Sequence, residues 1–230
     1  MSCILAIETS TSTCSAALSV DGVVLFEKSS GDGPSHAALL GVYVEEAFSV
    51  LKRQALKPDA IAVSNGPGSY TGLRIGVSMA KGLCYGLGIP LLSIPTLKIM
   101  ASGVAGRYAE AGGALYCPML DARRMEVYAA IYDADLRLLR KTAADIVTAD
   151  TYAPFLEKNI LYFFGNGAAK CKEVIASPNA RFMEDIHPLA VDMIPLAEEA
   201  FEGKQVEDLA YFEPFYLKEF TGTIAKNKLF

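Results

Sequence analysis

The sequence predicts an α/β protein made of two related halves, each with a mixed β-sheet flanked by helices. Short apolar segments alternate with longer stretches of helical periodicity along the chain. The order strand-strand-strand-helix-strand-helix-strand opens the chain and begins again, in a shorter form, after Gly112-Gly113. Because Gly and Ala cluster over 103–113, we predict one domain over 1–105 and a smaller one over 106–230.

The first half should contain five strands and three helices. Asp21-Gly22 is a strong signal for a tight turn between two antiparallel strands. Apolar stretches rich in β-branched residues predict strands at 3–8, 14–20, 23–28, 60–64 and 91–94. Apolar residues at helical spacing predict helices at 36–53, 72–86 and 97–105.

The second half should repeat this opening with shorter elements. We predict strands at 115–121, 126–132, 136–141 and 160–164, and helices at 151–158 and 168–176. The tail contains a helical stretch, 194–202, and an aromatic run, 211–216. Periodicity assigns this tail to neither half.

Composition narrows the class of protein. The chain has 230 residues and a net charge of -5, without the Lys/Arg clusters that would hold nucleic acid unaided. No stretch reaches the ~20 apolar residues of a membrane span, and the N-terminus does not resemble a signal peptide. Five widely spaced cysteines predict reduced, buried thiols in a cytoplasmic protein. His36 and His187 do not suffice for a histidine-rich metal site, although composition leaves a carboxylate magnesium site open.

The most informative segment, 64–76, joins a predicted strand to a predicted helix. Its glycines let a ligand or another chain approach the backbone, and Thr71 is the expected N-cap of a helix whose free N–H groups would favour an anion. The candidate phosphate contacts are Asn65, Gly66, Gly68, Ser69, Thr71 and Gly72. The spacing matches neither a P-loop nor G-x-G-x-x-G, so a tight structural turn or close helix packing explains the same glycines.

A second candidate phosphate contact lies at the first predicted hairpin. Glu8, Thr9 and Ser10 lead into a run of small hydroxyl residues there. Hydroxyl and backbone N–H groups at such a turn can contact phosphate, and a carboxylate can hold a metal-bound water. The alternative is that the hydroxyls only satisfy the backbone of the turn.

The predicted helices 36–53 and 72–86 carry more apolar surface than an ordinary surface helix. One face should meet the sheet, and a partner protein would cover the other more easily than this chain can. Burial of both helices within the chain is the alternative. We expect an interface formed by Leu39, Leu40, Tyr43, Val44, Ala47, Leu51, Leu73, Ile75, Gly76, Met79, Ala80 and Leu83. Val44→Glu or Ala80→Glu should then abolish pairing without unfolding the chain.

Four stretches resemble the bacterial TsaB (YeaZ) proteins, and they cover nearly the whole chain in the expected order. They are 4–10, 64–76, Asp121-Ala122-Arg123 and 214–218. The Gly-Pro-Gly-Ser-Tyr-Thr-Gly-Leu-Arg block within 64–76 is the specific part. The resemblance implies an actin-like (ASKHA) fold of two related domains, in agreement with the duplication.

The resemblance also implies a function. TsaB proteins act in forming N6-threonylcarbamoyladenosine at position 37 of tRNAs that read ANN codons. Their paralogue TsaD is the catalytic transferase, TsaB is its non-catalytic dimerisation subunit, and the ATPase TsaE joins them. We therefore expect a scaffold that pairs with TsaD, reaches TsaE and tRNA through the complex, and forms a homodimer when alone. The older glycoprotease label is not expected to describe an activity.

Departures from the catalytic paralogues agree with this expectation. TsaD proteins carry two metal-binding histidines four residues apart, whereas Thr96 and Met100 stand at the matching positions here. Glu8 replaces the usual Asp of the actin-like phosphate hairpin, and 165–167 is a reduced form of the Gly-rich adenosine loop. We expect no metal and no required cofactor, with at most weak ATP or ADP binding.

Two other functions stay open. An actin-like ATPase or phosphotransferase would bind a nucleotide between the halves, with Glu8 and the 66–72 loop on its phosphates. A metallopeptidase would need metal ligands for which the sequence offers no set.

Overall fold

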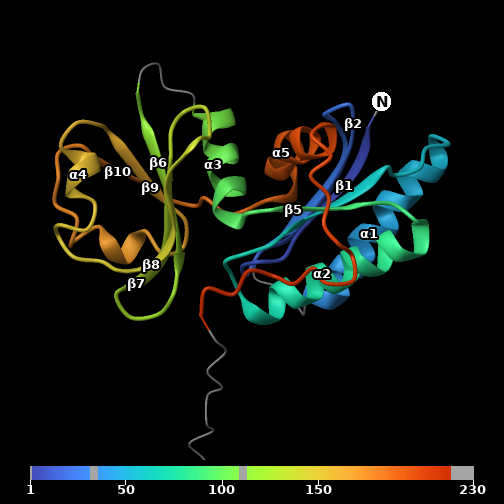
Figure 1. The fold of residues 1–230 in the computed structure, drawn as a ribbon, viewed down its shortest axis with the longest axis horizontal. Coiled ribbons are helices and arrows are strands. Elements are labelled where there is room, and N and C mark those ends of the chain that lie inside the picture. Colours follow the sequence, from blue (N-terminus) through green and yellow to red (C-terminus); the bar gives the residue numbers. More distant parts are fainter. Residues whose placement is uncertain (1, 32–35, 109–112, 219–230) are drawn as a thin grey trace, which may run out of the picture.

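The computed structural model describes residues 2–31, 36–108 and 113–218, and within them the chain forms two five-stranded mixed β-sheets (Figure 1). The first sheet has the order β3-β2-β1-β4-β5, and the second has the order β10-β9-β6-β7-β8. Each sheet opens with an antiparallel hairpin whose first strand also pairs in parallel with a later strand, β4 or β9. This repeated topology confirms the predicted duplicated fold. Residues 109–112 of the predicted boundary lie outside the described residues.

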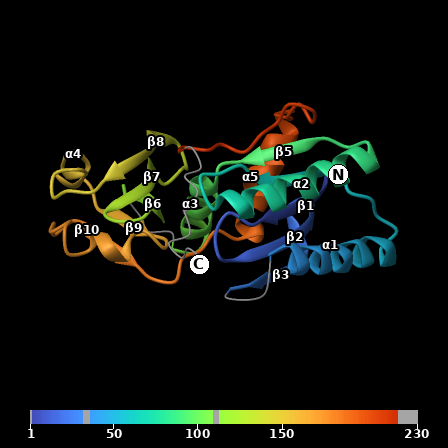
Figure 2. The same cartoon turned by 90° about the horizontal axis from the view of Figure 1, so that it is seen from below.

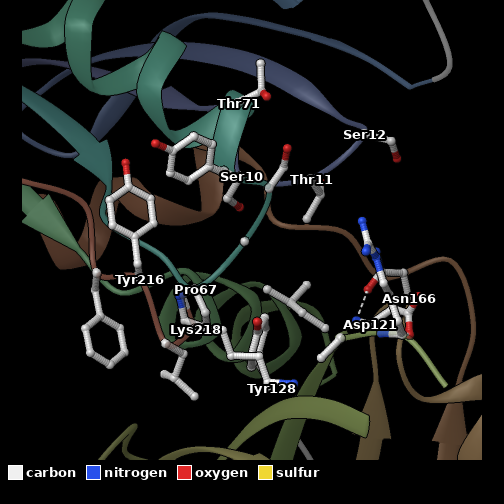
Figure 3. A pocket seen from close by; sticks show the side chains of 18 residues that line it. Ser10, Thr11, Ser12, Pro67, Thr71, Asp121, Tyr128, Asn166, Tyr216 and Lys218 are labelled. Atoms are coloured by element: carbon white, nitrogen blue, oxygen red, sulfur yellow. Dashed lines mark hydrogen bonds between the residues drawn. The ribbon is translucent and has the colours of Figure 1, made fainter. Parts of the chain in front are cut away.

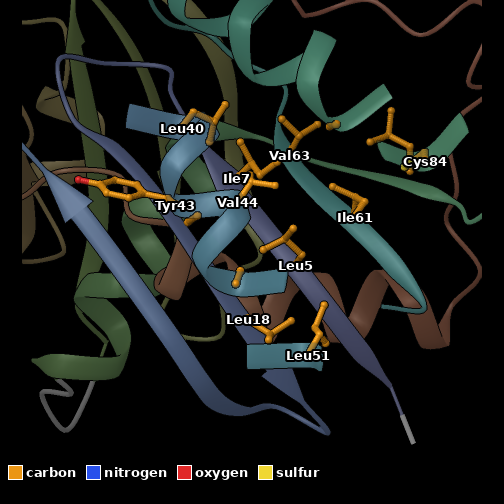
Figure 4. Close-up of a cluster of buried hydrophobic side chains, with 14 of the residues drawn as sticks. Leu5, Ile7, Leu18, Leu40, Tyr43, Val44, Leu51, Ile61, Val63 and Cys84 are labelled. Carbon is orange, nitrogen blue, oxygen red and sulfur yellow. The ribbon is translucent and has the colours of Figure 1, made fainter. Parts of the chain in front are cut away.

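The first lobe contains the first sheet and three helices. Its strands are β1 (Cys3–Glu8), β2 (Cys14–Val20), β3 (Val23–Ser30), β4 (Ala60–Ser64) and β5 (Leu91–Ile94). Its helices are α1 (His36–Arg53), α2 (Tyr70–Leu87) and α5 (Ala190–Glu202). Because side chains alternate along a strand, β1 presents Leu5 and Ile7 to α1 and α2, and Ile4 and Ala6 to α5. Figure 4 shows the first of these two cores, and Figure 2 shows α1 and α2 from below.

The second lobe contains the second sheet and short helical segments. Its strands are β6 (Leu115–Asp121), β7 (Glu126–Tyr132), β8 (Leu138–Ile146), β9 (Leu161–Phe164) and β10 (Ala180–Met183). Helix α4 (Ala153–Leu156) and a 3-10 turn (Ala169–Cys171) pack on one face, over a core that includes Phe163. Asp145 accepts bidentate hydrogen bonds from Arg140 at 2.8 and 2.6 Å and a third from Tyr152 at 2.8 Å. This network ties β8 to the segment before α4.

Helix α3 (Thr96–Arg107) covers the other face of the second sheet and also packs against α5 of the first lobe. Leu97, Met100 and Val104 are fully buried against β6, β7 and β9. The α3–α5 contact joins the two lobes directly, as Figure 1 shows near its centre.

The tail after α5 returns along the first lobe and reaches the second. The Glu207 amide donates to the Leu91 carbonyl at 2.9 Å, and the Phe215 amide donates to the Asn65 carbonyl at 2.7 Å. Lys218 then forms a salt bridge with Glu126 on β7. The tail that periodicity left unassigned therefore contacts both lobes.

Several predicted boundaries were wrong. Helix α2 begins two residues early, and its N-cap is Ser69, whose hydroxyl accepts a hydrogen bond from the Gly72 amide, rather than Thr71. Strand β8 is longer than predicted and starts at residue 138. Helix α4 has four residues, and the predicted helix at 168–176 contains one 3-10 turn. Helix α5 begins at Ala190 and contains Pro195, and β10 was not predicted.

Candidate functional site

A cavity of about 670 Å³ lies between the lobes. Five segments line it: the turn after β1, the loop that begins α2, the β6–β7 hairpin, the loop after β9, and the tail (Figure 3). The lining residues are Ser10, Thr11, Ser12, Pro67, Gly68, Ser69, Tyr70, Thr71, Leu120, Asp121, Ala122, Arg123, Tyr128, Asn166, Phe215, Tyr216, Leu217 and Lys218. The first lobe contributes mainly hydroxyl groups, and the tail contributes mainly apolar and aromatic groups.

The glycines of the loop before α2 allow close contact with the turn after β1. A methyl group at Gly68 would collide with the Ser10 carbonyl, and one at Gly72 would collide with the Thr9 carbonyl. The Ser69 amide donates to the Ser10 carbonyl at 2.7 Å, and the Thr9 hydroxyl donates to the Gly72 carbonyl at 2.7 Å. The turn of this same chain therefore occupies the space that these glycines open.

Glu8 is fully buried beside this turn and does not line the cavity. Its Oε1 accepts a hydrogen bond from the Ser10 amide at 2.5 Å, whereas Oε2 has no partner within the described residues. Desolvation raises the pKa of Glu8 to about 6, and the nearby Ser10 and Ser64 hydroxyls oppose this rise. Neither hydroxyl forms a hydrogen bond within the described residues. The hydroxyl of Thr96 is likewise buried without a partner in the described part of the chain.

The structure thus divides the candidate phosphate contacts into two groups. Ser10, Gly68, Ser69 and Thr71 line the cavity. Glu8, Thr9, Asn65, Gly66 and Gly72 do not. The helix end is also partly satisfied, because the Ser69 hydroxyl already accepts from the Gly72 amide at 3.2 Å. Phosphate contact at these residues stays a prediction.

Aromatic rings at the edge of the cavity come from α2 and the tail. The rings of Tyr70 and Tyr216 lie 5.0 Å apart, and the Arg74 guanidinium lies 5.0 Å from the Tyr70 ring centre. From the sequence we assigned no cavity role to Tyr70, Tyr128 or the tail, whereas Asn166 lies in the 165–167 stretch that we compared with an adenosine loop. The family-like stretches around 121–123 and 214–218 were the available signal, since both contribute to the lining.

The twelve predicted interface residues separate into two groups by burial. Leu40, Tyr43, Val44, Ala47, Leu51, Leu73, Gly76 and Ala80 are buried within this chain. Leu39, Ile75, Met79 and Leu83 are half-buried at the edge of the same core. Val44 is 7% exposed and Ala80 is 0% exposed, so a glutamate at either position would be placed in the core. The expectation that Val44→Glu or Ala80→Glu would leave the fold intact was therefore wrong.

The candidate metal positions are buried. Thr96 and Met100 are both 0% exposed. The described residues contain no group of three or more His, Cys, Asp or Glu side chains arranged to hold a metal ion.

All five cysteines are buried and free, and burial raises the pKa of the Cys3, Cys14 and Cys84 thiols to about 11. In the described part of the chain, no helix is both long enough and apolar enough to cross a membrane.

Two mixed sheets of repeated topology with a cleft between them define an actin-like α/β protein. The family model of TsaD, tRNA N6-adenosine threonylcarbamoyltransferase, matches residues 33–220. The TsaB protein of Bacillus subtilis is 30% identical over 89% of this chain and 98% of its own length, and that of Escherichia coli is 30% identical over 94% of each. A crystal structure of a Pseudomonas aeruginosa protein described as similar to peptidase YeaZ aligns at 28% identity, covering 95% of this chain and 100% of that one, with a TM-score of 0.81. The chain belongs to the TsaB (YeaZ) family.

Proposed function

We propose that this chain is a non-catalytic scaffold subunit in the formation of N6-threonylcarbamoyladenosine at position 37 of ANN-decoding tRNAs. The names of its TsaB relatives support the pathway. In this proposal α1 and α2 pair with the corresponding helices of a TsaD paralogue in the cytoplasm, and the pair joins TsaE and tRNA. One structural observation supports the pairing most directly, namely the outward face of these two helices.

That outward face combines exposed apolar side chains with glycines. Val42, Tyr85 and Leu87 are 49%, 83% and 44% exposed. Gly41 on α1 and Gly82 on α2 face open space, because a Cβ atom at either position would meet nothing within 4 Å. A helical glycine costs up to about 1 kcal/mol relative to alanine, and no contact within the described residues requires a glycine at either position. Close approach of a partner helix would require them.

The buried acid supports the non-catalytic part of the proposal. Glu8 would be the phosphate-facing residue of an actin-like ATPase, but its carboxylate is fully buried and lies outside the cavity lining. Thr96 and Met100 offer poor ligands for a hard divalent metal. Neither feature suits a centre for hydrolysis or group transfer.

Light scattering of the chain, alone and mixed with TsaD from the same source, tests the pairing. We expect a homodimer through an isologous contact, replaced by a 1:1 complex when TsaD is added. Gly82→Leu should weaken both assemblies and leave the fold intact, because its side chain would enter open space. Gly106→Leu on α3 is the matched control, since Gly106 is also a helical glycine facing open space. The proposal would be overturned if the chain stayed a monomer both alone and in the presence of TsaD. It would also be overturned if the Gly82→Leu variant paired as well as the wild type.

A further inference from the structure

The hairpin between β6 and β7 contains two consecutive arginines in an unfavourable backbone conformation. Arg123 has φ +72° and Arg124 has φ +50°. This left-handed region is costly for residues with a Cβ atom, and Gly, Asn and Asp are the usual occupants. The hairpin between β2 and β3 has φ of +47° and +75° and uses Asp21-Gly22 there. The chain therefore meets the same backbone demand with favourable residues in one hairpin and with arginines in the other.

Side chains of the second lobe hold the arginine turn in place. Lys170 donates to the carbonyls of Arg124 and Glu126, both at 2.7 Å, and forms a salt bridge with Asp121. The Asp121 amide donates to Asn166 Oδ1 at 2.8 Å, the dashed line in Figure 3. Asp121 Oδ1 in turn accepts from the Arg123 amide at 3.1 Å. The costly conformation is thus fixed by its surroundings, which is typical of functional positions.

The two guanidinium groups are available to a ligand. Both arginines are exposed, and within the described residues neither side chain forms a salt bridge or a hydrogen bond. Arg123 lines the cavity, whereas Arg124 does not. A small ligand inside the cavity would therefore meet Arg123 alone, whereas a polymer that extends past the cavity along the hairpin would also reach the exposed Arg124.

We propose that Arg123 and Arg124 form a phosphate-contacting hairpin tip that binds the backbone of an RNA, a proposal that rests on the proposed function in tRNA modification. Guanidinium groups match phosphate geometry and remain charged at any physiological pH. Contacts of this kind set the position of a nucleic acid and carry no sequence information. Because the chain has a net charge of -5, the tip supplies part of the binding and a partner subunit supplies the rest.

The double variant R123N/R124G separates binding from folding. Asn and Gly tolerate the left-handed conformation, so this variant should melt at the same temperature as the wild type or higher. The control K57N/K158N removes the same charge from two exposed lysines elsewhere. Binding of a labelled tRNA transcript is measured by fluorescence anisotropy over a salt series, with the full chain mixed with TsaD. We expect R123N/R124G to bind about tenfold more weakly, with a log Kd against log salt slope reduced by roughly 1 to 2, and the control to bind like the wild type.

Other outcomes overturn the inference. Equal affinity of R123N/R124G and the control would show that the tip does not touch RNA. Loss of ATP binding by R123N/R124G with unchanged tRNA affinity would assign Arg123 to a nucleotide in the cavity. Loss of the TsaD complex by R123N/R124G alone would assign the tip to an acidic protein surface. If the wild-type chain does not pair with TsaD, the scaffold proposal fails separately, and the same RNA titration is made with the chain alone.

Discussion

Arg107 on α3 forms a bidentate salt bridge with Asp192 on α5, with hydrogen bonds of 2.8 and 3.2 Å. The two residues come from the helices that join the lobes. Asp192 is 9% exposed, and burial raises its pKa while Arg107 opposes that rise. Gly103 lies beside them, and a side chain there would collide with both. One of the contacts between the lobes is therefore a charge pair that packs closely against a glycine of α3.

Replacing Arg107 and replacing Asp192 should change the free energy of unfolding by different amounts. Arg107→Gln leaves a buried carboxylate without its cation and should lower the free energy of unfolding by roughly 2 kcal/mol. Asp192→Asn removes the buried charge itself and leaves a half-exposed arginine, so it should cost about 1 kcal/mol or less. Urea denaturation of both variants measures the difference. Arg137→Gln, from an exposed pair with Asp135, is the control and should be nearly neutral. Equal losses at positions 107 and 192 would contradict the asymmetry.

Glu8 should make stability depend on pH in a predictable direction. Its pKa rises from 4.5 to about 6 on folding, so between these values the folded state keeps a proton that the unfolded state releases. The free energy of unfolding should therefore fall by up to about 2 kcal/mol as pH rises from 4.5 to 6, and stay level with respect to this group above that. Glu8→Gln should remove this fall, because Gln keeps an acceptor for the Ser10 amide without a charge. Urea denaturation from pH 4 to pH 8 tests this, and identical pH profiles would contradict it.

The tail should restrain the loop that begins α2. Tyr216→Ala removes the ring contact with Tyr70, worth about 0.5–1.5 kcal/mol, and should speed amide exchange in residues 65–70 about fivefold. Tyr211→Ala is the control, since Tyr211 is 84% exposed and its ring forms no aromatic contact within the described residues. Hydrogen exchange with mass spectrometry reads out both variants. Equal exchange rates in this segment would show that the tail does not restrain it.

Local patterns predicted most of the fold. The turn at Asp21-Gly22 and the buried strands β1, β4 and β6 follow from short-range propensity and burial, and the structure confirms them. The missed strand, β10, is a half-exposed edge strand of four residues whose pairing with β9 depends on a distant segment. Helix α5 begins at Ala190, four residues before its predicted start, and contains Pro195, a residue that usually disrupts the interior of a helix.

The candidate site was less predictable than the fold. The sequence indicated that the glycines near residue 68 permit close approach, but it could not say what approaches. The approaching groups are Thr9 and Ser10, some 60 residues earlier in the chain. Likewise the tail residues and Tyr128 enter the cavity lining through tertiary contacts that no local sequence pattern indicates. Tertiary packing also buried most of the apolar helix surface that periodicity had left for a partner.

Helix α5 has a consequence for how the chain is made. The first sheet is assembled from residues 3–94, yet the cover for one of its faces is synthesised about 100 residues later, after the whole second lobe. Until α5 has been made, the apolar side chains of Ile4, Ala62 and Leu92 lack this cover, and such exposed apolar surface favours aggregation of the incomplete chain. The first lobe is thus the earlier to begin folding during translation and cannot finish before the second has been made.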